Sequence, residues 1–177
     1  MRLRRASLRR PATPPARRLP LHRRSPASLL VLGGSSAQRR EVARECHELG
    51  PAGTAPFLAL DCAHEESRLA AALECWLTSG GTGLWGEPLP ACAGGMLFLD
   101  SVSALSPATQ RLLLLLAIAL QTRLPGAPHG GRPARLAAGD PGELPDAVAS
   151  QTFSRALFDC LDKIRVELPL PARSGAA

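Results

Sequence analysis

Short apolar runs alternate along this chain with longer stretches that have helical periodicity. The runs occupy residues 28–33, 56–62, 96–100, 134–140 and 163–171. Their apolar character is continuous, so both faces of each strand are expected to be buried. Strands of this kind, separated by helices, predict a single α/β domain in which helices cover both faces of a parallel sheet.

The intervening stretches indicate amphipathic helices at residues 38–49, 65–77 and 106–121, with shorter ones at 143–149 and 154–162. The third begins with Ser106 and Pro107, a favourable cap and first helical position. Residues 78–95 are rich in Gly and Pro and predict a long loop. The expected buried faces of the first two helices are Val42, Ala43, Cys46 and Leu49, and Leu69, Ala72, Leu73 and Trp76.

The positive charge of the chain is concentrated at its start. Residues 1–27 hold nine arginines and no acid, whereas the rest holds all 15 acids against the other 12 basic residues, a balance of −3. The start lacks apolar periodicity and is expected to be disordered. Three interpretations stay open: an organellar transit peptide, a nucleic-acid-binding arm, or an extension with no role of its own.

Five cysteines and four histidines are spread through the chain without a C-x-x-C pair or the spacing of zinc ligands. An odd number of scattered cysteines indicates reduced thiols that are mostly buried. No apolar run reaches the length of a membrane span; the longest covers residues 112–120.

The turn after the first predicted strand stands where a phosphate-binding loop would stand. The pattern for such a loop is G-x-x-x-x-G-K-[ST]. Gly33 matches its first Gly, but Gln38, Arg39 and Arg40 replace the second Gly, the Lys and the Ser/Thr. A loop that curls around phosphates needs the second Gly, so a Gly-Ser turn before an amphipathic helix is the alternative interpretation.

The third predicted strand ends at Asp100 and is followed by Ser101. In P-loop ATPases an acid at this place holds Mg²⁺, and a second acid often follows to polarise water. Asp100 is therefore either a relic of a metal-side carboxylate or an acid exposed in a turn.

Read in order, residues 28–174 resemble the ATPase core of bacterial sigma-54-dependent transcription activators, which are AAA+ proteins. The family's "GESGTGKExxARxIH" is similar to "GGSSAQRREVARECH", its "PFVxxNCAA" to "PFLALDCAH", and its "GGTLFLDEI" to "GGMLFLDSV". Its "QxxLLRxL", "FRxDLxYRL" and "ixLPPLRxR" resemble "QRLLLLLA", "FSRALFDCL" and "VELPLPARS". The resemblance implies a P-loop-type three-layer sandwich, an AAA+ core without its helical lid.

The departures from the family fall on its chemistry, while the apolar frame is kept. Compared with the family, Ser101 replaces the catalytic Glu and Asp140 replaces a sensor Asn. Ser154 and Cys160 replace two arginines that act on a neighbouring subunit's nucleotide, with Arg155 one residue displaced. The family's sigma-54-contacting loop would lie within residues 76–86, where Thr82 and Gly83 echo its centre.

The resemblance thus implies a nucleotide site without an intact catalytic set. Asp100 is the relic of its metal-side acid, which would contact the nucleotide by holding Mg²⁺. Any binding of ATP–Mg²⁺ is expected to be weak. Its expected cofactor-binding residues are Gly33, Gly34, Ser35, Ser36, Ala37, Gln38, Arg39 and Arg40.

The function implied is a sigma-54-interaction module in transcription regulation that does not hydrolyse ATP. The alternatives are a residual ATP-binding protein or slow ATPase, and a non-functional fragment of a decayed activator. The expected partners are sigma-54 RNA polymerase or an intact AAA+ activator. Nucleic acid would be bound only through the basic start, no membrane is involved, and the expected location is the bacterial cytoplasm.

Overall fold

A computed structural model describes residues 25, 27–79, 88–122 and 132–169. Its strands are β1 (Leu29–Leu32), β2 (Phe57–Asp61), β3 (Met96–Asp100), β4 (Arg135–Asp140) and β5 (Ile164–Glu167). All the strand pairs are parallel, and the order across the sheet is β2-β3-β4-β1-β5. The predicted α/β fold with a parallel sheet is confirmed.

The helices follow the expected positions closely. They are α1 (Ser36–Glu48), α2 (Cys62–Thr78), α3 (Pro107–Gln121), α4 (Leu144–Ala149) and α5 (Arg155–Leu161). Helix α1 begins two residues before the expected start. Helix α2 gains a first turn that is separated from the rest by a non-helical Glu65. Short 3₁₀ turns lie at Pro90–Cys92 and Val102–Ala104.

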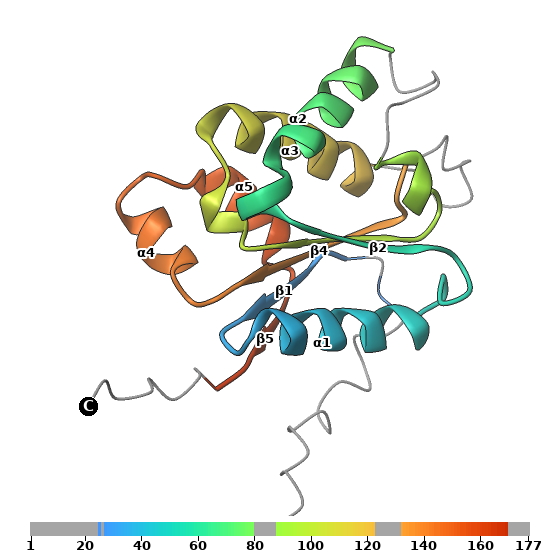
Figure 1. Ribbon diagram of the computed structural model, residues 1–177, viewed down its shortest axis with the longest axis horizontal. Helices are drawn as coiled ribbons and strands as arrows, with labels where there is room; N and C mark the ends of the chain where they lie inside the picture. Colours follow the sequence, from blue (N-terminus) through green and yellow to red (C-terminus); the bar gives the residue numbers. More distant parts are fainter. Residues whose placement is uncertain (1–24, 26, 80–87, 123–131, 170–177) are drawn as a thin grey trace, which may run out of the picture.

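Helices cover both faces of the sheet, which gives the three layers (Figure 1). Alternate residues of each strand point to opposite faces, so Leu29 and Val31 of β1 pack with Ala43 and Cys46 of α1. The other face forms the larger core cluster under α2, α3 and α5. Its helix residues include Leu69, Leu73, Trp76, Leu113, Leu116, Leu157 and Leu161.

The expected buried face of α2 is confirmed, since Leu69, Ala72, Leu73 and Trp76 are all buried. The expected face of α1 is wrong at Leu49, whose side chain is 48% exposed. Leu49 is the C-cap residue of α1, where the chain leaves the helix, and its side chain no longer lies above the sheet.

Of the five cysteines, Cys46, Cys62 and Cys92 are buried and the other two are partly buried. Burial raises the pKa of the Cys62 thiol and raises that of Cys92 to about 12. Both thiols are therefore unreactive at neutral pH. Within the described ranges, no helix is both long and apolar enough to cross a membrane.

The predicted division into residues 1–27 and 28–174 stays a prediction. Strand β1 begins at Leu29, one residue after the predicted boundary. The expected disorder before it falls almost entirely on residues outside the described ranges.

Candidate functional site

The turn after β1 is formed by Gly33 and Gly34, which have φ angles of 80° and 61°. Glycine adopts such angles more readily than any other residue. A Cβ on Gly33 would also lie 2.3 Å from the carbonyl oxygen of Leu168. The Gly33 N–H donates to the Asp140 carbonyl (2.9 Å) and the Gly34 N–H to the Pro169 carbonyl (3.2 Å). The backbone donors of this turn are thus already bound within the protein.

Helix α1 is closed at its start by a capping box. The Ser35 hydroxyl accepts from the Gln38 N–H (3.3 Å), and the Gln38 side-chain oxygen accepts from the Ser35 N–H (2.8 Å). The sequence S-x-x-Q is the signature of this arrangement, and it explains why the helix starts earlier than expected. Of the N–H groups from residue 33 to residue 39, the described structure leaves only those of Ser36 and Ala37 without a partner.

Arg39 points inward from the first turn of α1 and binds Asp100 at the end of β3. Its Nε and Nη2 atoms donate to the two carboxylate oxygens of Asp100, at 2.6 and 3.0 Å. Its Nη1 atom donates to the carbonyls of Gly34 (2.8 Å) and Gly33 (3.2 Å). The side chains are 4% and 1% exposed. The alternative of Asp100 as an acid exposed in a turn is therefore wrong.

The small residue Gly139 makes room for this ion pair. Strand β4 lies between β3 and β1, so an α1 side chain that reaches Asp100 must pass over the end of β4. A Cβ on Gly139 would lie 2.5 Å from the Oδ1 atom of Asp100 and 2.8 Å from the Phe98 ring. A larger residue at this position is thus incompatible with the observed place of the carboxylate.

Ser101, at the position of the family's second acid, has a left-handed backbone with φ of 54°. On the neighbouring strand β2, Asp61 is in register with Asp100. The Oδ2 atom of Asp61 lies 2.9 Å from the Nδ1 atom of His64. Burial acts to raise the pKa of Asp61, but hydrogen bonds from His64 and the Ala63 N–H outweigh it and lower that pKa. In the part of the chain that the structure describes, no three His, Cys, Asp or Glu residues gather as metal ligands.

Asp140, at the sensor position, is fully buried and bound by backbone amides. Its Oδ1 atom accepts from the N–H groups of Gly142, Glu143 and Leu144, at 2.8 to 3.0 Å. Its Oδ2 atom accepts from the N–H of Ser103 at 3.2 Å. The carboxylate therefore joins the start of α4 to the turn after β3, a structural role that its place in the sequence did not reveal.

The remaining predicted residues lie apart from this cluster. Arg40 is exposed on α1. Ser154 caps α5 through a bond from the Leu157 N–H, and Arg155 is exposed and paired with Asp159. Cys160 is partly buried. Thr82 and Gly83 lie outside the described residues.

Sequence reasoning placed Arg39 and Asp100 in one site but missed that they bind each other. Three features of the sequence carry the signal together: an arginine at the lysine position, a single acid after β3, and a glycine at the end of β4. Arginine is long and planar enough to reach a carboxylate with two parallel bonds, which lysine cannot form.

Known proteins resemble this chain over most of its length. The family profile of the Sigma-54 interaction domain matches residues 15–167. The Nif-specific regulatory protein of Herbaspirillum seropedicae is 31% identical over 156 residues, which are 84% of this chain and 29% of that protein. The nitrogen fixation protein VnfA of Azotobacter vinelandii is 30% identical over 151 residues, 82% of this chain and 29% of that protein. The chain thus spans less than a third of the length of these relatives.

Solved structures agree on the fold. NtrX from Brucella abortus in complex with ATP has a TM-score of 0.65 at 22% identity, over 84% of this chain and 34% of that one. The P-loop NTPase domain of the sigma-54 transport activator from E. coli has a TM-score of 0.60 at 20% identity, over 88% and 92%. With the family profile covering most of its residues, the chain belongs to the Sigma-54 interaction domain family.

Proposed function

We propose that this domain takes part in sigma-54-dependent transcription regulation through protein contacts, without hydrolysing ATP. The observation that carries the proposal is the bidentate ion pair between Arg39 and Asp100. It joins the two side chains that an active relative would use for phosphate and for Mg²⁺. In this chain they neutralise each other.

The acid side of the site supports this proposal. A magnesium-binding carboxylate turns an oxygen and its negative charge toward the metal, but both oxygens of Asp100 accept hydrogen bonds from Arg39, whose positive charge repels a second cation beside it. Ser101 has no carboxylate with which to polarise a water molecule. The described residues therefore do not fit ATP–Mg²⁺ in this conformation.

The phosphate side supports it as well. A phosphate-binding loop holds its ligand by several backbone N–H groups that converge on it. Here Gly33, Gly34, Ser35 and Gln38 donate theirs to protein oxygens. The guanidinium of Arg39 is turned toward Asp100 and the glycine carbonyls. We therefore propose that Arg39 hinders nucleotide binding, although the sequence suggested it as one of the residues that would bind the cofactor.

Calorimetric titration with ATP–Mg²⁺ tests the nucleotide part of the proposal. The wild-type chain is expected to bind with a dissociation constant no tighter than about 100 μM, roughly −5.5 kcal/mol. Changing Gln38→Gly and Arg39→Lys together should tighten binding, because it breaks the capping box and frees one oxygen of Asp100. Arg111→Lys, at an exposed position of α3 outside the site, is the matched control. Sub-micromolar binding by the wild type would instead support a residual ATP-binding protein.

A phosphate-release assay tests the chemistry separately. No turnover above the background is expected from the wild-type chain, because removing single groups that stabilise phosphoryl transfer already costs several kcal/mol. Turnover that disappears in Asp100→Asn would show a slow ATPase and overturn the proposal.

The partner is tested with sigma-54 RNA polymerase and with an intact AAA+ activator. Both would be met in the cytoplasm, where we place this protein. We expect the chain to bind one of them equally well with and without ATP, and to change the ATPase rate of the activator if that is the partner. No binding to either would favour the alternative of a non-functional fragment.

A further inference from the structure

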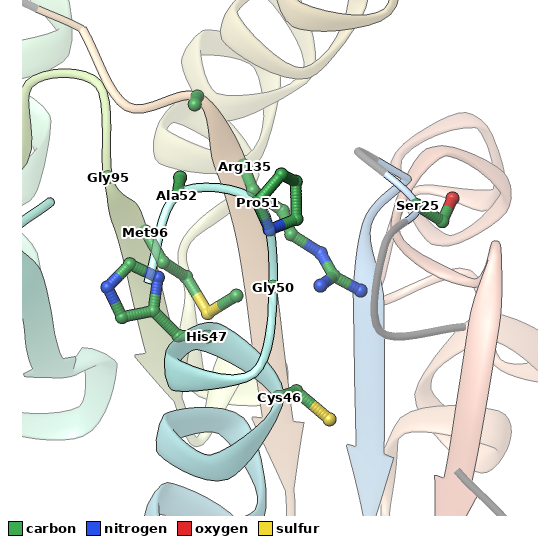
Figure 2. A pocket seen from close by; sticks show the side chains of 10 residues that line it. Ser25, Cys46, His47, Gly50, Pro51, Ala52, Gly95, Met96 and Arg135 are labelled. Carbon is green, nitrogen blue, oxygen red and sulfur yellow. The ribbon is translucent and has the colours of Figure 1, made fainter. Parts of the chain in front are cut away.

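A second buried arginine lies at the opposite end of the strands, beside a small pocket. Arg135 opens β4, so it stands at the amino ends of the strands, whereas Asp100 stands at a carboxyl end. The pocket has a volume of about 60 Å³ and is lined in part by Cys46, His47 and Met96. In Figure 2 the Arg135 side chain extends from β4 toward the segment that carries Ser25.

The charge of Arg135 has no counter-ion among the described residues. The residue is only 8% exposed, and its Nε atom donates to the Ala27 carbonyl at 2.7 Å. None of the ion pairs of the described chain includes it, and its two Nη groups have no acceptor there. Burial lowers the pKa of Arg135, the direction for a cation whose charge is poorly compensated.

Two other polar side chains that line the pocket each make one hydrogen bond within the protein. The Nε2 atom of His47 lies 2.8 Å from the Ala55 carbonyl, and the Ser25 hydroxyl accepts from the Ala27 N–H. At the end of α1 the carbonyls of Glu45 and His47 accept from the N–H groups of Leu49 and Gly50. The Nη donors of Arg135 have no acceptor in the described structure, and because they belong to a cation they suit an anion and not a cation.

We propose that this pocket binds one small anionic group, a carboxylate or a phosphate, on the Nη groups of Arg135. The volume fits such a group, since a single water needs only about 10–15 Å³ by the same kind of measure. A planar guanidinium offers paired donors that match the oxygens of both groups. The partial negative charge at the end of α1 opposes an anion, so we expect an affinity in the millimolar range.

The test is an NMR titration of the full chain with sodium acetate and, separately, with sodium phosphate, at constant ionic strength set by sodium chloride. The probe is the Nε–Hε resonance of Arg135, assigned by through-bond correlation along its side chain to the backbone. A saturable shift of this resonance supports the proposal, and the anion that saturates first shows whether carboxylate or phosphate is preferred. The exposed Arg165, paired with Asp162, is the internal control and should not shift.

The variant Arg135→Gln lacks this resonance, so binding to it and to the wild type is compared on the backbone amide of Met96, which also lines the pocket. The variant should weaken binding by about tenfold or more, because it removes the charge that holds the anion. Arg165→Gln should leave it unchanged. If Arg135→Gln does not fold, the wild-type titration decides the question by itself. The absence of a saturable shift at Arg135, or an equal shift at Arg165, would overturn the proposal.

Discussion

Two arginines are buried in the part of this domain that the structure describes, and they lie toward opposite ends of the strands in different surroundings. Arg39 makes four hydrogen bonds, two of them to a carboxylate that is itself buried. Arg135 makes one, to a backbone carbonyl. The comparison teaches that burial alone does not mark a binding site. A charge that is paired within the protein closes its surroundings to ligands, whereas one without a protein counter-ion leaves a place for them.

The largest expected effect comes from breaking the closed pair. Arg39→Met should lower the free energy of unfolding by about 3–5 kcal/mol, because it leaves Asp100 buried without a counter-charge. The double variant Arg39→Met with Asp100→Leu should lose less than Arg39→Met alone, since no charge is then stranded. Chemical denaturation measures both. A loss below about 1 kcal/mol in the single variant, as for an exposed pair, would show that the pair is not closed in solution.

Gly139→Ala tests whether the closed pair depends on the room beside it. The new Cβ would meet the Oδ1 atom of Asp100 at 2.5 Å, so we expect a loss of about 1–3 kcal/mol from overpacking. The same change in an Asp100→Ala background should cost less, because only the contact with Phe98 remains. Equal costs in the two backgrounds would mean that Phe98, and not the ion pair, requires the glycine.

Arg135→Met should have a smaller effect than Arg39→Met. It removes one hydrogen bond, about 0.5–1.5 kcal/mol, and also removes a buried charge that lacks a partner, which offsets part of that loss. Thermal or chemical unfolding at low anion concentration measures it, with Arg165→Met as the exposed control. A loss as large as that of Arg39→Met would abolish the contrast between the two arginines.

The fold could be predicted from the sequence because each strand is a continuous apolar run and each helix has a clear apolar face. The sequence also placed Arg39 and Asp100 at one candidate site, since Asp100 ends such a run and Arg39 follows the turn after another. The pairing could not be predicted, because it depends on the strand order that brings β3 and β1 to either side of Gly139. Arg135 was not singled out, because nothing in a local pattern shows that a charge at the start of a strand will be buried.

The smallest expected effect concerns a carboxylate that is only partly buried. Glu66 accepts from the Ser106 N–H (2.8 Å) and from the Thr109 hydroxyl (2.7 Å). Hydrogen bonds from Ser106 and Thr109 hold its pKa below the ordinary value of 4.5, although burial opposes them. A lowered pKa in the folded state means that the contribution of Glu66 to stability is fully present above pH 4.5 and is lost as the pH falls through the lowered value.

Unfolding of the wild type and of Glu66→Gln, measured from pH 6 down to about pH 3, should therefore show a steeper loss of stability with acid in the wild type. Glu74→Gln, at an exposed position of the same helix, is the control and should follow the wild type. The Glu66 carboxylate, which accepts hydrogen bonds from the start of α3, would then be an intermediate case between the two arginines. It is bound by protein donors but is still partly exposed to solvent. Parallel curves for the wild type and Glu66→Gln would show that solvent alone satisfies Glu66, and that the closed surroundings of Arg39 do not extend to this helix.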